Sequence, residues 1–167
     1  MNKVALLIGG NQGDRRALIE QATVLIQERI GTVVLASAIY ETEPWGKFEV
    51  SSEELGVRSF FNRALVVETE LSAHEVLHEA LVIEKELGRQ RNLITHHSSL
   101  ITRLYHSRPM DIDLIFFNEE IIDTPDLQIP HPRAHLRRFV LEPLAEIMPE
   151  YRHPVFGLTV AELLDRL

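Results

Sequence analysis

At 167 residues, 45% of them apolar and 25% charged, the chain is predicted to form one globular domain over 1–167, and disordered, collagen-like and low-complexity proteins are excluded. With 17 Lys and Arg against 25 Asp and Glu, the net charge is −8, which disfavours nucleic acid and anionic membranes as partners. The absence of cysteine excludes disulfides, thiolate metal sites and thiol nucleophiles.

The first predicted elements are a strand, a helix and a second strand. Residues 3–9 form an apolar run typical of a buried strand, and Asp14 is placed to cap a helix over about 15–30. Gly31 stands where a left-handed helix cap is expected. The β-branched and apolar stretch over 32–42 then predicts a second strand.

A long loop separates these elements from a second strand–helix unit. Residues 44–58 contain Pro, Gly and several Glu, and the alternating pattern over 60–71 predicts a strand. Ser72 and Glu75 form a capping box, so a helix is expected from there to about Leu87, with Gly88 ending it.

The remaining part of the chain begins with a polar stretch over 89–109. The elements expected after it are a strand over 110–117, short extended pieces over 120–123 and 127–129, a helix over 136–147, and a C-terminal helix opened by the Thr159–Glu162 capping box. The order β-α-β-β-α-β followed by helices predicts an α+β fold with a ferredoxin-like antiparallel sheet flanked by helices.

The strongest chemical signal is the pair Asp111 and Asp113. Residues two apart on a strand face the same side, so both carboxylates are expected to project together, with Ile112, Leu114 and Phe116 on the opposite, buried face. Adjacent like charges need compensation, and a hard divalent cation with oxygen ligands is the natural candidate. The alternative is a solvated strand face with two harmless carboxylates.

Clustered arginines around this pair point to phosphate. Two segments that flank the Asp pair, 89–110 and 133–138, contain no acidic residue although the chain is acidic. Guanidinium groups bind phosphate oxygens in a bidentate manner, and an acidic pair with a metal and an arginine cluster is the composition of a phosphoryl-transfer site. The arginines concerned are Arg89, Arg91, Arg103, Arg108, Arg133, Arg137 and Arg138.

Three weaker signals accompany it. Pro130 and Pro132 preset the direction of His131. Asn62 is unusual within a strand, because Asn is depleted there. The segment 9–15 joins a strand to a helix as phosphate loops do, but it lacks the Walker and Rossmann spacings, and a tight turn is the favoured interpretation.

Taken together, the motifs resemble those of the 6-hydroxymethyl-7,8-dihydropterin pyrophosphokinase family of folate biosynthesis. The resemblance covers about residues 3–150. The motifs that carry it are Ile8 to Asp14, Tyr40 to Gly46, Phe61-Asn62, Glu84 to Arg89, Arg108 to Leu114 and Pro130 to Arg133, with Arg137 to Leu141 and Pro143-Leu144 continuing the match.

The resemblance implies an ATP-dependent diphosphotransferase that moves pyrophosphate from ATP to the pterin hydroxymethyl group and releases AMP. It implies two Mg²⁺ ions held by Asp111 and Asp113, with Arg91 and Arg108 as further catalytic groups. The residues that it implies for ATP are Glu84, Arg89, Arg91, Arg108, His131 and Arg137. Those that it implies for the pterin are Gly9, Thr42, Pro44, Trp45, Phe60, Asn62, Asp111 and Phe139.

The segment between Arg91 and Arg108 is longer than in the shorter family members, and Tyr105 stands where some of them carry Trp. Its acid-free, aperiodic sequence predicts a lid over 92–107 that orders on ATP, against the alternative of a tolerated insertion.

The short N-terminal apolar run and the lack of a long apolar stretch predict a cytoplasmic protein, expected to be a monomer. Competing functions are a non-catalytic nucleotide-binding module and a metal-dependent nuclease, which would need a basic surface.

Overall fold

The computed structural model describes residues 1–43, 59–92 and 109–167, with the backbone alone over 89–92. Its centre is an antiparallel sheet in the order β2-β4-β1-β5, with β3 added beside β4. The strands are β1 (Asn2–Gly10), β2 (Thr32–Ala36), β3 (Tyr40–Thr42), β4 (Phe60–Thr69) and β5 (Asp111–Phe117). A separate two-stranded sheet pairs β6 (Ile122–Asp123) with β7 (Gln128–Ile129).

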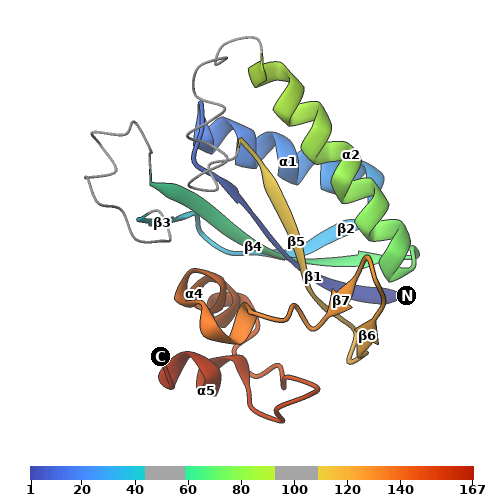
Figure 1. Ribbon diagram of the computed structural model, residues 1–167, viewed down its shortest axis with the longest axis vertical. Helices are drawn as coiled ribbons and strands as arrows, with labels where there is room; N and C mark the ends of the chain where they lie inside the picture. The colour runs from blue at the N-terminus through green and yellow to red at the C-terminus, as the bar shows by residue number, and fades with distance from the viewer. Residues whose placement is uncertain (44–58, 93–108) are drawn as a thin grey trace.

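Two helical layers cover the sheet, one on each face (Figure 1). The first layer contains α1 (Arg15–Arg29) and α2 (Ala73–Asn92), and the second contains α4 (Arg138–Ile147) and α5 (Val160–Asp165), with the short 3-10 helix η1 (Ala134–Leu136) before α4. The predicted α+β class with an antiparallel sheet is confirmed. The strand order is consistent with the expected ferredoxin-like arrangement.

Side-chain alternation along β1 builds both cores. Val4, Leu6 and Ile8 belong to the cluster that packs under α1 and α2, whereas Ala5 and Leu7 belong to the cluster that packs under α4 and α5. A strand buried on both faces needs an apolar residue at every position, which is why residues 4–8 form a continuous apolar run.

The local capping signals are confirmed. The Ala17 N–H donates to Asp14 Oδ1 at 3.1 Å. Glu75 N–H donates to Ser72 Oγ at 3.2 Å and Ser72 N–H to Glu75 Oε1 at 3.0 Å, and the Thr159–Glu162 capping box is likewise complete. Such motifs form within one turn and need no tertiary context.

Two predictions for glycines at helix ends are wrong: the helix stop at Gly88 and the left-handed conformation of Gly31, although α1 does end before Gly31. The helix α2 continues through Gly88 to Asn92, because Leu87 is buried against the core and offsets the roughly 1 kcal/mol cost of a helical glycine. Gly31 does not have a left-handed backbone. It instead lies against the Glu68 carbonyl of β4, where a Cβ would collide with the backbone.

The single strand expected over 32–42 is divided into β2 and β3 by Ser37. Its hydroxyl accepts a hydrogen bond from the Ala64 N–H at 2.9 Å, and its own N–H donates to the Ala64 carbonyl at 2.9 Å. The helix expected over 136–147 is likewise divided into η1 and α4. The strand is divided by hydrogen bonds between distant segments, and the helix by a local change of helix type. The periodic pattern of the sequence reveals neither.

Phe116 does not face the same side as Ile112 and Leu114, contrary to the expectation. A register shift sets Leu114 opposite Leu6 and Phe116 opposite Ala5, so Ile115 is an extra residue in β5. The bulge reverses the alternation. Phe116 therefore packs in the core under α4, while Ile112 and Leu114 pack under α1 and α2.

Candidate active site

The candidate site lies at one end of the sheet, where a row of paired residues crosses four strands. In register, Tyr40 of β3 pairs with Asn62 of β4, Asn62 with Gly9 of β1, and Gly9 with Asp111 of β5. In the neighbouring row Asp113 pairs with Leu7, which belongs to the core under α4. Because paired residues face the same side, both aspartates and Asn62 lie on the face covered by α4.

Gly9 leaves room between the two polar members of this row. A Cβ at Gly9 would collide with the Asn62 side-chain oxygen and with the Phe61 carbonyl. Only glycine therefore allows the Asn62 amide to lie against β1 at this point. The sequence prediction of Gly9 as part of the site coincides with a backbone position that permits close approach.

Asn62 is 6% exposed, and its amide nitrogen Nδ2 has no hydrogen-bond partner among residues 1–43, 59–92 and 109–167. Leaving a buried donor unpaired costs about 1–3 kcal/mol. Each such group in a native fold needs an explanation, and a functional role is one.

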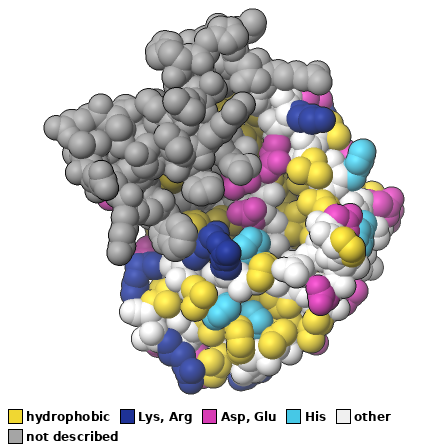
Figure 2. All heavy atoms as spheres, viewed as in Figure 1, with side chains coloured by type: hydrophobic (Ala, Val, Ile, Leu, Met, Phe, Trp, Pro, Cys, Tyr) yellow, Lys and Arg dark blue, Asp and Glu magenta, His cyan; other side chains and the backbone are white. Residues whose placement is uncertain are grey.

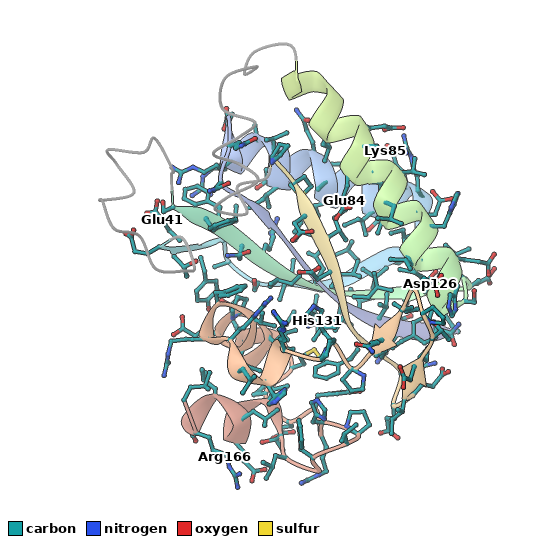
Figure 3. All side chains as sticks on the ribbon, in the orientation of Figure 1. Glu41, Glu84, Lys85, Asp126, His131 and Arg166 are labelled. Atoms are coloured by element: carbon teal, nitrogen blue, oxygen red, sulfur yellow. The ribbon has the colours of Figure 1, made fainter. Side chains whose placement is uncertain are left out.

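Glu84 adds a third carboxylate from the opposite side of β5. Figure 3 shows it pointing from α2 toward this strand, and its Oε2 accepts a hydrogen bond from the Ile112 N–H at 2.6 Å. Burial, together with the charges of Asp111 and Asp113, raises the pKa of Glu84 to about 7 although the Ile112 N–H acts against the shift. Burial and the carboxylates of Asp111 and Asp113 therefore both disfavour the ionised form of Glu84.

His131 and Arg137 approach the aspartates from the segment that leads into α4. Burial and the neighbouring charge of Arg137 lower the pKa of His131, although Asp111 acts in the opposite direction. The Arg133 N–H donates to His131 Nδ1 at 3.2 Å, which leaves the proton of the neutral ring on Nε2. Burial also lowers the pKa of Arg137, while the charges of Asp113 and Asp111 oppose that shift.

Acidic side chains, His and basic side chains therefore adjoin on one face of the molecule. Figure 2 shows this meeting near the centre of the view. Among the residues whose positions are described, no three His, Asp or Glu side chains are grouped as ligands of one metal ion.

A pocket of about 420 Å³ opens beside Asp113 and His131. Its apolar walls come from α2, from β5 and from the β6–β7 segment, and include Leu77, Leu114 and Leu127. The sequence analysis missed this pocket. The sequence analysis singled out Asp113 and His131, but the apolar wall residues follow ordinary core patterns in three separate segments, so no sequence signal grouped them with that pair.

The aromatic residues expected at the pterin lie on the same face as Asn62. Phe60 is two residues from Asn62 on β4 and pairs with Thr42 of β3. Phe139, in the first turn of α4, packs against the core on that side, and the Arg137 guanidinium carbon lies 5.6 Å from its ring centre.

Several expected site residues lie outside the described part. These are Pro44, Trp45 and Arg108, as well as the side chains of Arg89 and Arg91 and the predicted lid apart from Asn92. The structure thus brings together Gly9, Thr42, Phe60, Asn62, Glu84, Asp111, Asp113, His131, Arg137 and Phe139 at one end of the sheet.

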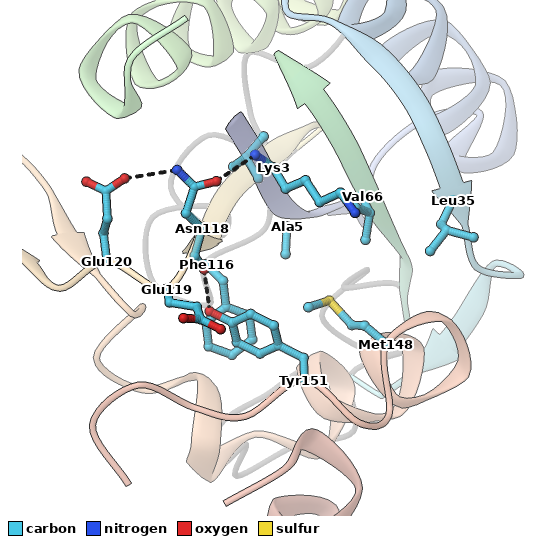
Figure 4. A pocket seen from close by; sticks show the side chains of 11 residues that line it. Lys3, Ala5, Leu35, Val66, Phe116, Asn118, Glu119, Glu120, Met148 and Tyr151 are labelled. Carbon is cyan, nitrogen blue, oxygen red and sulfur yellow. Dashed lines mark hydrogen bonds between the residues drawn. The ribbon is translucent and has the colours of Figure 1, made fainter. Parts of the chain in front are cut away.

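A larger cavity, of about 720 Å³, lies at the other end of the sheet (Figure 4). Ala5, Val66 and Phe116 line it from the sheet, and Met148 and Tyr151 from the C-terminal layer. None of the predicted site residues takes part in it. Its size alone therefore does not make it the catalytic centre.

No helix of the described ranges is long and apolar enough to cross a membrane.

Residues 5–149 match the family described as 7,8-dihydro-6-hydroxymethylpterin-pyrophosphokinase (HPPK). Proteins named 2-amino-4-hydroxy-6-hydroxymethyldihydropteridine pyrophosphokinase are similar to the chain. The one from Porphyromonas gingivalis is 37% identical over 152 residues, 90% of this chain and 93% of that protein. The one from Bacillus subtilis is 38% identical over 149 residues, 88% of this chain and 79% of that protein.

Solved structures agree in fold. One described as HPPK-DHPS in complex with substrates aligns with a TM-score of 0.70 at 20% identity, over 99% of this chain and 43% of that one. The Plasmodium falciparum HPPK-DHPS aligns with a TM-score of 0.69 at 19% identity, over 99% of this chain and 44% of that one. The chain thus spans less than half the length of these neighbours. On the match over residues 5–149 and its relatives, the chain belongs to the 7,8-dihydro-6-hydroxymethylpterin-pyrophosphokinase family.

Proposed function

We propose that the row Asn62–Gly9–Asp111 is where this chain transfers pyrophosphate from ATP to 6-hydroxymethyl-7,8-dihydropterin. Family membership gives the reaction, an ATP-dependent pyrophosphoryl transfer in folate biosynthesis. The observation that supports the place is the Asn62 amide, buried and without a hydrogen-bond partner among the described residues, on the same face as the two aspartates. A heteroaromatic substrate edge with a carbonyl acceptor would satisfy that donor.

The pterin is proposed to lie over Gly9, between Phe60 of β4 and Phe139 of α4. Flat rings stack favourably against aromatic side chains, and Asn62 and Thr42 would bind the polar edge of the ring. Pro44 and Trp45, implied by the family resemblance, stay a prediction for this pocket.

The adenosine part of ATP is proposed to occupy the pocket of about 420 Å³ beside Asp113. Its apolar walls suit a purine, and Asp113 and His131 in its lining would place the phosphates beside the aspartates. His131 Nε2 and the Arg137 guanidinium would donate hydrogen bonds to phosphate oxygens. Arg89, Arg91 and Arg108 are expected to add further phosphate contacts.

Asp111 and Asp113 are proposed to hold Mg²⁺. Two carboxylates with substrate phosphates are a common magnesium donor set. After burial, the charges of Asp111 and Asp113 help to raise the pKa of Glu84, so a cation at this place would be favoured. When bound, Mg²⁺ supplies neutralisation of phosphate charge and activation of the attacking hydroxyl. Asp111 would accept the hydroxyl proton, and the residues around it would hold both substrates in line.

Incubation with ATP, Mg²⁺ and the reduced pterin, followed by chromatography of the nucleotide, tests this function. AMP and the pterin diphosphate in equal amounts are expected. ADP as the main product, or hydrolysis of ATP that is indifferent to the pterin, would contradict the proposal. The cytoplasmic location, the single-domain organisation and the monomeric state expected from the sequence stay predictions.

A further inference from the structure

A single carboxylate near the end of α4 binds the connection between β2 and β3 through two hydrogen bonds. Glu146 Oε1 accepts a hydrogen bond from the Tyr40 hydroxyl at 2.7 Å. Glu146 Oε2 accepts one from the Ala38 N–H at 3.0 Å. Both oxygens of one side chain on the helix therefore bind to the three-residue strand β3 and the residues that precede it.

These two hydrogen bonds lie next to the proposed pterin site. Tyr40 is the register partner of Asn62, and Thr42, at the other end of the same strand, is the partner of Phe60. The helix that carries Glu146 also carries Phe139 in its first turn. Glu146 therefore joins the strand side of the proposed pterin site to its helix side.

The other side of the β2–β3 connection is already fixed to β4. Ser37 exchanges hydrogen bonds with Ala64, and the Arg63 Nε–H donates to the Ser37 carbonyl at 2.9 Å. With Ser37 bound to the sheet and Ala38 bound to α4, the distance between sheet and helix is set at adjacent residues. A short edge strand has few other means of resisting displacement.

We propose that Tyr40 and Glu146 form a positioning pair that sets the separation of the two walls of the pterin site. The inference rests on the proposed function, since the walls matter only if a flat ring binds between them. Neither residue touches the substrate in this account. Their effect is to keep the pocket preformed, so that binding does not include the cost of ordering β3 against α4.

The chemistry of the pair is that of a phenol donating to an ionised carboxylate, which is stronger than a bond between neutral groups. The hydrogen bond to Glu146 is the main cause that raises the pKa of Tyr40, followed by burial and by the charges of Glu146 and Glu142. This shift gives a spectroscopic signature of the intact pair.

The test uses Tyr40→Phe, Glu146→Leu and the double variant in steady-state kinetics with both substrates. Tyr40→Phe is expected to raise the KM for the pterin about fivefold, the effect of losing one hydrogen bond of about 1 kcal/mol. Glu146→Leu, which also loses the bond to the Ala38 N–H, is expected to raise it at least as much. In both variants kcat is expected to stay within about twofold and the KM for ATP to stay unchanged. The double variant is expected to match Glu146→Leu, because that change already removes the partner of Tyr40. Glu146→Gln, which keeps one acceptor for Tyr40, is expected to restore part of the affinity.

Two matched controls separate positioning from general damage. Tyr151→Phe removes a tyrosine hydroxyl that donates to the Asn118 carbonyl at the far end of the sheet, at 2.6 Å. Glu142→Gln removes a carboxylate of the same helix, one that pairs with Arg138. Both controls are expected to leave the pterin KM unchanged. NMR titration of ¹³C-labelled tyrosine is expected to show a lower Tyr40 pKa in Glu146→Leu.

An unchanged pterin KM in both Tyr40→Phe and Glu146→Leu would overturn the inference. Additive effects in the double variant, or an equal effect of Tyr151→Phe, would overturn it as well. A wild-type protein that makes no AMP would instead refute the proposed function. In that case a Tyr40 pKa unmoved by Glu146→Leu would also refute the pair itself.

Discussion

The two ends of the central sheet treat their polar groups in opposite ways. At the end near Gly9, the Asn62 amide is buried without a partner among the described residues, and three carboxylates approach one another. At the other end Asn118 is surrounded by partners. Its side chain accepts from the Lys3 N–H at 2.9 Å and donates to Asn2 at 3.0 Å, and its carbonyl accepts from the Tyr151 hydroxyl at 2.6 Å.

The difference shows which end of the sheet lowers the stability of the fold and which end raises it. Saturated hydrogen bonds at the Asn118 end contribute to folding, whereas at the Gly9 end the Asn62 donor, unpaired among the described residues, and the mutual repulsion of the carboxylates lower stability. The larger cavity lies at the Asn118 end, and the proposed active site lies at the Gly9 end. Variants at the two ends should therefore affect different quantities.

The largest effect is expected at the aspartates. Asp111→Ala and Asp113→Ala should each lower turnover on the order of 10³-fold or more, because the phosphate charge would no longer be compensated. The free energy of unfolding should stay equal or rise, since local repulsion is relieved. Kinetics at saturating Mg²⁺ together with urea denaturation measure both. Glu119→Ala at the other end is the control, and turnover near that of the wild type in either Asp variant would remove the residue from the site.

A loss of stability without loss of chemistry is expected at Asn118. This residue has φ of 50°, in the left-handed region, so Asn118→Ala combines lost hydrogen bonds with backbone strain and should lower the free energy of unfolding by about 3 kcal/mol. Asn118→Gly removes only the side-chain bonds and should lower it by less. Urea denaturation checks the order of the two variants. A fall in kcat as large as at the aspartates would break the distinction between the ends.

Glu84 gives a pH dependence of stability. Its folded-state pKa of about 7 lies above the ordinary value of 4.5, so the wild-type protein loses stability as the pH rises from about 4.5 through 7. Glu84→Gln, which still accepts from the Ile112 N–H, should be more stable than the wild type at pH 8 by about 2 kcal/mol and equal to it at pH 4. Thermal or urea unfolding at both pH values measures this. A difference that is the same at both would contradict it.

Asn62→Ala sharpens the comparison with the smallest expected change. Removing a buried amide nitrogen that has no partner in the described part of the chain should alter the free energy of unfolding by less than about 1 kcal/mol, whereas the affinity for the pterin should fall about tenfold. Isothermal titration with the pterin and urea denaturation test the two halves. A large loss of stability with unchanged binding would mean that the amide serves the fold rather than the ligand.

The sequence predicted what depends on neighbours along the chain. The caps at Asp14, Ser72 and Thr159 form within one helical turn, and the buried strand over 3–9 follows from its apolar run. Family resemblance, rather than pattern alone, selected Asn62 and Phe139, which the fold brings to one face. No local pattern joins these two residues.

The sequence did not predict what depends on contacts between distant segments. The close approach of Gly31 to β4, the break at Ser37 and the pocket beside Asp113 each need two or more elements in place. The bulge at Ile115 is hidden for a similar reason, because it is defined by the partner strand and not by β5 itself.

The bulge at Ile115 limits how the length of β5 can change. On the Asp111 side of Ile115 the odd-numbered residues face α4, and beyond it the phase of the strand is reversed, so that Phe116 faces α4 and Phe117 faces α1 and α2. Because of the extra residue, the half of β5 that carries the aspartates and the half that carries the phenylalanines alternate independently. Deleting Ile115 would bring both halves into one phase and force either the aspartates or the phenylalanines onto the wrong side of the sheet.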